Sequence, residues 1–285
     1  MSGVNDRAVK VERIIQPSAW DVVHDSLALS AKLAADESIK YLVLDYSDAF
    51  YMMPVARSEL KYCGAWYQGC WYIWLVIPQG SVNGPSVYGR LAALTARMGQ
   101  GLTDSTELRT QLYVDDPCST VRGTAERSDR LVTILILFWL ILGWRLACHK
   151  GQYGRQVEWV GYSISITASM VEAKIKEDFM HDLRSLVQAY LAENLITIDQ
   201  LRSFAGKANH VATLVYTWRP FLDQCWAAIA GTKPSGAPRG KVWVKQIAAC
   251  LKWLRIFLED EPHTLTRRWR IDFYLQPGGE YMYFS

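Results

Sequence analysis

Apolar and polar positions divide the first part of the chain into segments with different periods. Residues 19–36 carry apolar side chains at helical spacing, which predicts a helix. Residues 41–44 form a continuous apolar run that ends at Asp45, which predicts a buried strand with a carboxylate at its carboxyl end. Aromatic and small side chains alternate over 60–77, as is typical of a β-hairpin. A loop at 78–86 then leads into a helix through about residue 99, capped by Asn83 or Ser86.

The middle of the chain contains an uncharged run over 131–144. A membrane span needs about 20 such residues, so the run predicts a buried core helix over 131–146 and no membrane partner. Residues 157–164 alternate like a strand pair with a glycine at the bend.

The pattern changes again after residue 176. Residues 177–192 predict an amphipathic helix, and Thr197 to Gln200 is a capping-box start for a second helix through about 216. Residues 233–240 are the clearest linker. They precede an expected helix over 241–258 and a β-like end over 269–284.

Composition sets broad limits on the class of protein. Half of the 285 residues are hydrophobic, which is enough for a sizeable core. The net charge of +3 is mildly basic and is compatible with nucleic-acid binding without indicating it. The 12 Trp and 15 Tyr residues suit either core packing or stacking on bases. Six cysteines without a CxxC pair, and a charged start without a signal peptide, favour an intracellular protein, cytoplasmic or nuclear, with reduced thiols that are mostly buried.

An acidic pair, Asp115 and Asp116, follows a short β-prone run over 111–114, and Pro117 is expected to end regular structure directly afterwards. At a hairpin tip both carboxylates can reach one cleft. Adjacent carboxylates raise each other's pKa unless a cation lies between them, and Mg²⁺ prefers such oxygen ligands. An isolated pair of this kind is otherwise an ordinary acidic turn.

The acidic pair belongs to a set of motifs that resembles a reverse transcriptase of the LTR-retroelement and retroviral branch, including the DIRS-like elements. Motifs A, B and C are similar to Asp45-x-x-Asp48-Ala49-Phe50, Pro78-Gln79-Gly80 and Tyr113-Val114-Asp115-Asp116. Residues 142–150 resemble motif D, and residues 159–162 resemble motif E. Residues 198–209 resemble the helical segment that follows in this group, and residues 4–9 resemble its fingers motif. The resemblance covers roughly residues 4–225.

This resemblance implies an α+β right-hand polymerase. Its expected parts are partial fingers (1–40), a palm (41–165) with an interleaved fingers hairpin at about 55–78, a helical thumb-like segment (166–231) and a connection segment (232–285). Residues 281–284 resemble the first strand of a ribonuclease H domain, cut before its first acidic residue, so we expect no RNA-strand cleavage by this chain.

The implied activity is RNA-directed DNA synthesis with two Mg²⁺ or Mn²⁺ ions. The metal ligands would be Asp45, Asp115, Asp116 and the main-chain carbonyl of Tyr46. Lys150 would protonate the leaving pyrophosphate. Nucleotide-binding residues would be Arg7, Tyr46, Asp48, Ala49, Phe50, Gln79, Gly80, Tyr113 and Val114. Primer- and template-binding residues would be Trp159, Gly161, Lys174, Lys176, Arg202 and Lys207.

The implied partners are a template with its primer, RNA or DNA, and deoxynucleoside triphosphates. Phe50 would lie under the sugar and exclude a 2′-hydroxyl. The rest of a Pol polyprotein, with ribonuclease H, integrase or recombinase, would lie outside this chain.

Structural roles compete with these assignments. Asp45 and Asp48 also suit helix or turn caps, Phe50 suits a core, and Pro78-Gln79-Gly80 suits a simple turn. Lys150 and the later basic residues suit solvated surfaces, and the Trp159 motif suits a packed hairpin. Asn5 and Lys10 depart from the fingers motif, and the lysine that usually partners Arg7 is not seen. An inactive or structural nucleic-acid-binding fragment is therefore the alternative function, and Phe50 argues against a viral RNA-dependent RNA polymerase.

Overall fold

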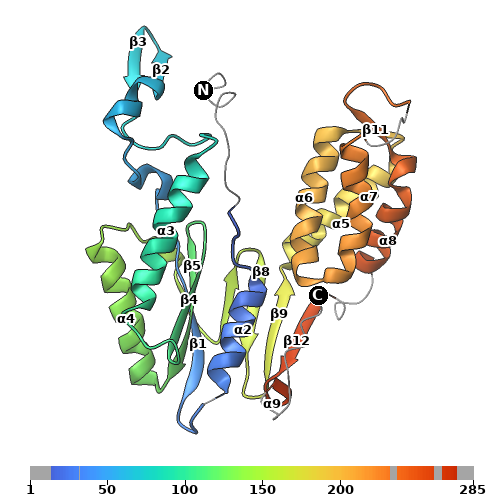
Figure 1. Cartoon of the computed structure of the whole chain (residues 1–285). Helices are drawn as coiled ribbons and strands as arrows, with labels where there is room; N and C mark the ends of the chain where they lie inside the picture. The colour runs from blue at the N-terminus through green and yellow to red at the C-terminus, as the bar shows by residue number, and fades with distance from the viewer. Residues whose placement is uncertain (1–13, 32, 232–235, 260–264, 275–285) are drawn as a thin grey trace. The chain divides into compact units, whose positions relative to one another are not determined.

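The computed structural model describes residues 14–31, 33–231, 236–259 and 265–274 (Figure 1). The expected fingers motif with Arg7 and the ribonuclease H-like strand lie outside these residues. The described residues form two compact units, which divide between Val160 and Gly161. Residues 166–169 and 271–274 belong to the first unit.

The sheet of the first unit has four strands. They are ordered β4 (Leu108–Tyr113), β5 (Asp116–Gly123), β1 (Ser38–Val43) and β6 (Gln152–Gly154), and every neighbouring pair is antiparallel. β1 confirms the apolar strand that the sequence predicts before Asp45, although it begins three residues earlier than expected.

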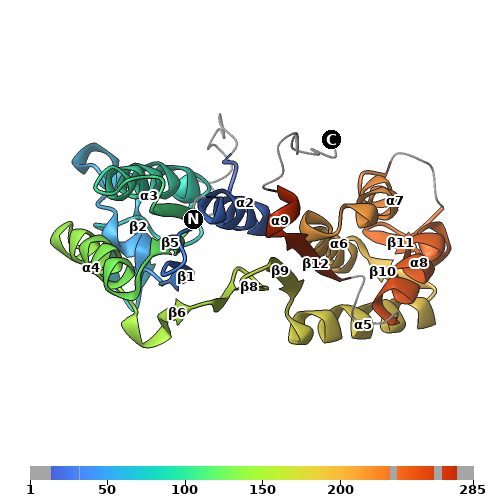
Figure 2. The same cartoon turned by 90° about the horizontal axis from the view of Figure 1, so that it is seen from below.

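Helices cover both faces of this sheet, because neighbouring residues of its central strands, which point to opposite faces, are both buried. Leu42 joins a core that includes α3 (Gly84–Gln100) and α4 (Ala125–Ile141). The neighbouring Tyr41 faces the other way, where its hydroxyl is 2.9 Å from that of Ser26 on α2 (Ala19–Ser30). Figure 2 shows α2 beside the sheet.

Two of these helices differ from the expected ones. α2 ends at Ser30, six residues early. α4 begins at Ala125, because the Thr124 hydroxyl caps it by accepting a bond from the Arg127 N–H. α4 joins the core along one face only, with Ile141 82% exposed, and it ends at Ile141, five residues before the expected end. In the part of the chain that the structure describes, no helix combines the length and the apolar character needed to cross a bilayer.

The aromatic segment forms the predicted hairpin. A 3₁₀ helix (Arg57–Tyr62) leads into β2 (Gly64–Tyr67), which pairs with β3 (Cys70–Ile73). Asn83 occupies the N-cap of α3 but makes no side-chain capping bond.

Pro117 does not end regular structure, contrary to expectation. β5 runs from Asp116 through Pro117 to Gly123. The carbonyl of Pro117 accepts a hydrogen bond from the Leu44 N–H (3.1 Å), so the residue takes part in the sheet through its acceptor alone. A strand tolerates proline at its start, where the sheet does not need the N–H group that proline lacks.

The second unit combines a sheet with four helices. β12 (Thr266–Arg270) pairs with β9 (Met170–Ile175), which lies beside β8 (Tyr162–Ile166). The helices are α5 (Glu177–Ala192), α6 (Ile198–Leu214), α7 (Arg219–Ile229) and α8 (Ala248–Glu259). α5 matches the predicted amphipathic helix.

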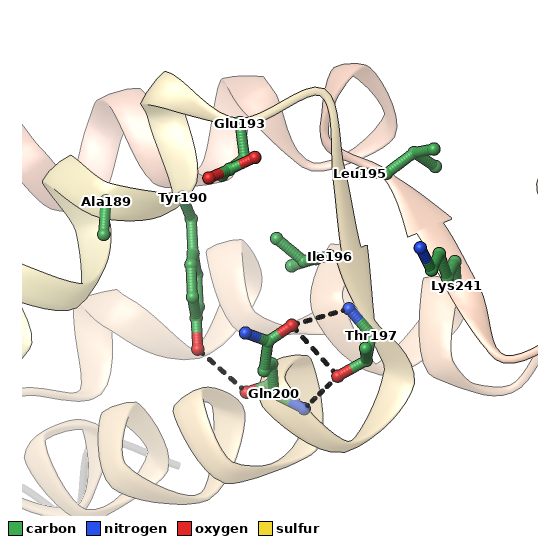
Figure 3. Close-up of a pocket in the computed structure, with 8 residues that line it drawn as sticks. All are labelled: Ala189, Tyr190, Glu193, Leu195, Ile196, Thr197, Gln200 and Lys241. Atoms are coloured by element: carbon green, nitrogen blue, oxygen red, sulfur yellow. Dashed lines mark hydrogen bonds between the residues drawn. The ribbon is translucent and has the colours of Figure 1, made fainter.

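The start of α6 confirms the predicted capping box. The Thr197 hydroxyl accepts a bond from the Gln200 N–H (3.1 Å), and the Gln200 side chain accepts one from the Thr197 N–H (2.8 Å), as Figure 3 shows.

The C-terminal part differs from expectation. Residues 241–243 form β11 (Lys241–Trp243), which pairs with β10 (Leu195–Thr197) because the paired Ile196 and Val242 are both buried, and α8 starts only at Ala248. Of the expected β-like end over 269–284, residues 275–284 lie outside the described residues; 269–270 close β12, and 271–274 form α9 (Ile271–Tyr274). All six cysteines are free, but only three are buried, fewer than expected.

Candidate active site

The β4–β5 hairpin presents the acidic pair at its tip. Tyr113 pairs with Asp116, so Val114 and Asp115 form a two-residue loop. Such tight loops use left-handed backbone at one or both loop positions. Val114 adopts it, with φ of 52°, although a β-branched residue is strained there. The fold maintains this strain at the place where the carboxylates are presented.

Asp45 lies beside this loop because the backbone on both sides of it bonds to the hairpin. The Leu44 N–H donates to the Pro117 carbonyl (3.1 Å), and the Tyr46 N–H donates to the Asp115 carbonyl (2.9 Å). The Asp45 carbonyl accepts a bond from the Ala147 N–H (2.9 Å). The carboxylates predicted from separate motifs are therefore brought together.

The three carboxylates interact electrostatically. Burial raises the pKa of Asp115, and the charge of Asp45 raises it further. Burial, Asp115 and Asp45 together raise the pKa of Asp116 to about 6. Carboxylates that share a site in this way disfavour one another's charged form.

Lys150 supplies a cation at this cluster. It ends a 3₁₀ turn (Cys148–Lys150), and its Nζ lies 2.5 Å from Asp45 Oδ2. This hydrogen bond and the charge of Asp45 raise the pKa of Lys150. The lysine is mostly exposed, so it can move away from Asp45 without leaving a core.

The donor set suits divalent cations. Three carboxylates and the nearby Tyr46 peptide offer the hard oxygens that Mg²⁺ and Mn²⁺ prefer. Among the described residues, however, no group of three or more His, Cys, Asp or Glu side chains is arranged to hold a metal ion. The oxygen ligands are of the right chemical type, and Asp45 is bonded to the Lys150 ammonium.

Phe50 lies next to this cluster on a 3₁₀ helix (Ala49–Met52) and stacks on Tyr88, with ring centroids 4.9 Å apart. Tyr88 is fully buried, and its hydroxyl has no hydrogen-bond partner among the described residues. Burial raises the pKa of Tyr88, and so do Asp115, Asp116 and Asp45. Tyr88 therefore stacks on Phe50 and also interacts electrostatically with the acidic cluster.

The other predicted nucleotide contacts lie in the segment that follows Asp45 and in the loop before α3. Asp48 is exposed, has left-handed backbone (φ 56°) and pairs with Arg145 (3.5 Å). Ala49 is buried. Gln79 is exposed, and Gly80 has φ of 87°, which glycine adopts without strain.

Trp159, expected at the primer end, contacts the acidic hairpin. Its ring is buried against Tyr113, and its Nε1–H donates to the Asp116 carbonyl (2.9 Å). Tyr46 is likewise buried and stacks on Trp144 (4.4 Å), so only its main chain is left for a ligand.

The remaining predicted template contacts belong to the second unit. Gly161 has φ of 79°, and a Cβ there would lie 2.7 Å from His210 Nε2, so this turn requires glycine. Lys174 is exposed and Lys176 precedes α5. Arg202 is exposed and Lys207 is half-buried, and they are ion-paired with Asp199 (2.6 Å) and Asp182 (3.3 Å).

The second unit also contains a cavity of about 300 Å³ between the end of α5 and β10 (Figure 3). Tyr190 and Gln200 line it, and the Tyr190 hydroxyl donates to the Gln200 carbonyl (3.2 Å). The Gln200 side chain already serves the α6 cap.

No protein-family model and no curated protein matches the chain. A solved foamy viral protease-reverse transcriptase dRH, in complex with double-stranded DNA, is 16% identical over 89% of this chain and 40% of that chain, with a TM-score of 0.57. A foamy viral protease-reverse transcriptase in complex with an RNA/DNA hybrid is 15% identical over 89% of this chain and 31% of that chain, with a TM-score of 0.54.

These likenesses show that the chain has the α+β fold of a retroviral reverse transcriptase, as the motifs predicted. It spans less than half of the length of either solved chain.

Sequence reasoning missed Tyr88 and Arg145. Tyr88 occupies a helix position at which any apolar residue fits the pattern, so its contact with Phe50, 38 residues earlier, has no local signal.

Proposed function

We propose that this chain is an RNA-directed DNA polymerase that adds deoxynucleotides to a primer 3′-hydroxyl. The observation that carries the proposal is the pair of backbone bonds that places Asp45 beside Asp115 and Asp116. Carboxylates from separate motifs converge there, as phosphoryl transfer with two metal ions requires.

Asp45 and Asp115 would hold two Mg²⁺ or Mn²⁺ ions, assisted by Asp116 and the Tyr46 carbonyl. Bound ions would stabilise the attacking and leaving oxygens. Lys150 would donate a proton to the leaving pyrophosphate once it releases Asp45. Phe50, supported by Tyr88, would contact the sugar and exclude a 2′-hydroxyl.

The other proposed nucleotide contacts are Gln79, Gly80 and the loop residue Val114. The proposed partners are a primed template and deoxynucleoside triphosphates. The two solved relatives are complexes with double-stranded DNA and with an RNA/DNA hybrid, which supports nucleic-acid binding by this fold. Lys174, Lys176, Arg202 and Lys207 would meet duplex phosphates. An LTR-type or DIRS-like element, with its other Pol domains outside this chain, remains the proposed origin.

Primer extension on an RNA template tests the proposal. The wild-type chain should extend the primer with deoxynucleotides only when Mg²⁺ or Mn²⁺ is present. Asp115→Asn should abolish extension. Asp223→Asn, which removes an exposed carboxylate on α7, is the matched control and should retain it.

The Lys150–Asp45 bond favours a second candidate function, an inactive nucleic-acid-binding fragment. In that case the ammonium group would be a permanent replacement for a metal. The same assay separates the two functions. Equal binding of the primed template by the wild type and Asp115→Asn, without extension by either, would support the inactive fragment.

A further inference from the structure

Residues 60–103 contain no Asp or Glu, although the chain has 28 such residues in 285. An even distribution would place about four there. The segment keeps Lys61, Arg90 and Arg97, and it includes the β2–β3 hairpin, the Gln79 loop and α3. A surface that lacks acids and carries a few cations suits a polyanion.

The β2–β3 hairpin exposes aromatic rings on both of its faces. Trp66 and Trp71 pair across the strands with ring centroids 5.3 Å apart, and they are 59% and 70% exposed. Tyr67 and Tyr72 lie on the opposite face with centroids 6.4 Å apart, and both are more than half exposed. We call these four residues the aromatic hairpin.

The aromatic hairpin has no core of its own. Its sheet has two strands only, and every residue of both strands is exposed. Figure 1 shows it extending away from the four-stranded sheet of its unit. Exposed apolar surface of this extent usually marks a binding site.

A continuous set of contacts connects the aromatic hairpin to the proposed nucleotide site. Trp74, which follows β3, stacks on Tyr51 with ring planes 13° apart and centroids at 6.2 Å. Tyr51 is the neighbour of Phe50. The Ile77 N–H donates to the Met53 carbonyl (2.9 Å), directly before the Gln79 loop. The exposed rings therefore lead away from the position at which an incoming nucleotide would pair.

We propose that the aromatic hairpin binds single-stranded nucleic acid, namely the unpaired template ahead of the primer end, by stacking its rings on successive bases. This inference rests on the proposed function, because the polymerase site determines where the template enters. Aromatic rings bind unpaired bases of any sequence, since every base has a π-face. The nearby Lys61, whose Nζ lies 4.9 Å from the Tyr62 ring centre, supplies charge for the phosphates.

The test compares two primer–template duplexes, one blunt and one with a template overhang of about eight nucleotides, a length within the range of known single-strand sites. Binding is measured by fluorescence anisotropy at fixed salt in EDTA, without nucleotides. The wild-type chain should bind the overhang duplex about tenfold more tightly than the blunt one. The double variant Trp66→Ala/Trp71→Ala should lose this difference and bind the blunt duplex as before.

Trp226→Ala is the control, because Trp226 is an exposed tryptophan of the second unit. It should keep the tenfold difference. The substituted hairpin rings belong to no core, so thermal melting should be unchanged.

Equal affinity of the wild type for both duplexes, or an unchanged overhang preference in the double variant, would overturn the inference. The inference would also be overturned if the wild type formed a dimer, the double variant did not, and the wild type showed no overhang preference. A second copy of the chain would then cover the hairpin. The outcome is independent of catalysis. A hairpin-dependent overhang preference without primer extension would refute only the proposed polymerase, and extension without that preference would refute only this inference.

Discussion

The indole N–H of Trp159 donates a hydrogen bond to the main-chain carbonyl of Asp116, with 2.9 Å between nitrogen and oxygen. The bond ties β7 (Gln156–Trp159) to the tip of the acidic hairpin within the first unit. The ring is buried and also packs edge-on against Tyr113. It therefore fixes the position from which the Asp116 side chain projects.

Trp159→Phe should destabilise the chain by about 2–3 kcal/mol, because it leaves the Asp116 carbonyl without its donor and opens a small cavity. Urea unfolding measures this change. Trp226→Phe, at an exposed site, should change stability by less than about 0.5 kcal/mol. Similar losses in the two variants would show that the bond to Asp116 has no special weight.

The raised pKa of Asp116 predicts a pH dependence of stability. Its pKa is about 6 in the folded chain against 3.8 for a free aspartate. The folded state therefore binds this proton more tightly than the unfolded state, and stability falls as pH rises from about 4 to about 6. The shift corresponds to at most about 3 kcal/mol. Because the side chain is half-exposed, solvent screening should reduce this to about 1 kcal/mol.

Asp116→Asn removes the cost of burying this charge and of placing it beside Asp115 and Asp45. In EDTA the variant should be about 1 kcal/mol more stable than the wild type at pH 7.5 and nearly equal to it at pH 4. Urea unfolding at the two pH values measures the difference. Asp223→Asn, at an exposed site on α7, should show no such gain at pH 7.5. A gain for Asp116→Asn that is the same at both pH values would contradict the electrostatic explanation.

Local signals explain the parts of the fold that sequence predicts well. The capping box of Thr197 and Gln200 involves residues three positions apart, so the start of α6 is visible in the sequence. The aromatic alternation likewise predicts the β2–β3 hairpin. The Pro117 prediction fails because proline usually ends strands, whereas here its carbonyl is used by Leu44, 73 residues earlier.

In the candidate site, too, local motifs reveal some residues and miss the contacts between distant segments. Motif order predicts that Asp45, Asp115 and Asp116 converge; backbone bonds join their segments, and their charges interact. The contacts of Tyr88 with Phe50 and of Trp159 with Asp116 join distant segments, and no local pattern announces them. The carboxylates are visible in the sequence, whereas the groups that hold them are visible only in the structure.

The Lys150–Asp45 bond predicts opposite effects of one substitution. Lys150→Gln removes a cation that competes with metal for Asp45, so Mn²⁺ should bind up to about fivefold more tightly, as expected for an exposed pair. Primer extension should nevertheless slow by about 100-fold, because the proposed proton donor is lost. Titration calorimetry and single-turnover extension measure the two effects. Lys252→Gln, at an exposed site on α8, should change neither. Weaker Mn²⁺ binding by Lys150→Gln would contradict the competition.

The stack of Phe50 on Tyr88 predicts how the chain selects the sugar. Phe50→Ala should raise the relative incorporation of ribonucleotides by about 10–100-fold, because the ring that would meet the 2′-hydroxyl is gone. Tyr88→Leu should raise it by about tenfold, because Phe50 loses the ring beneath it. The ratio of kcat/KM for deoxynucleotides to that for ribonucleotides measures both effects.

Tyr88→Phe is the matched control for this stack. It keeps the ring and removes only the hydroxyl, which is buried and has no partner among the described residues. The variant should retain the selectivity of the wild type, and it should be as stable or more stable by about 1 kcal/mol, because an unsatisfied buried polar group is removed. A loss of selectivity in Tyr88→Phe as large as that in Tyr88→Leu would show that the hydroxyl, and not the stacked ring, determines the position of Phe50.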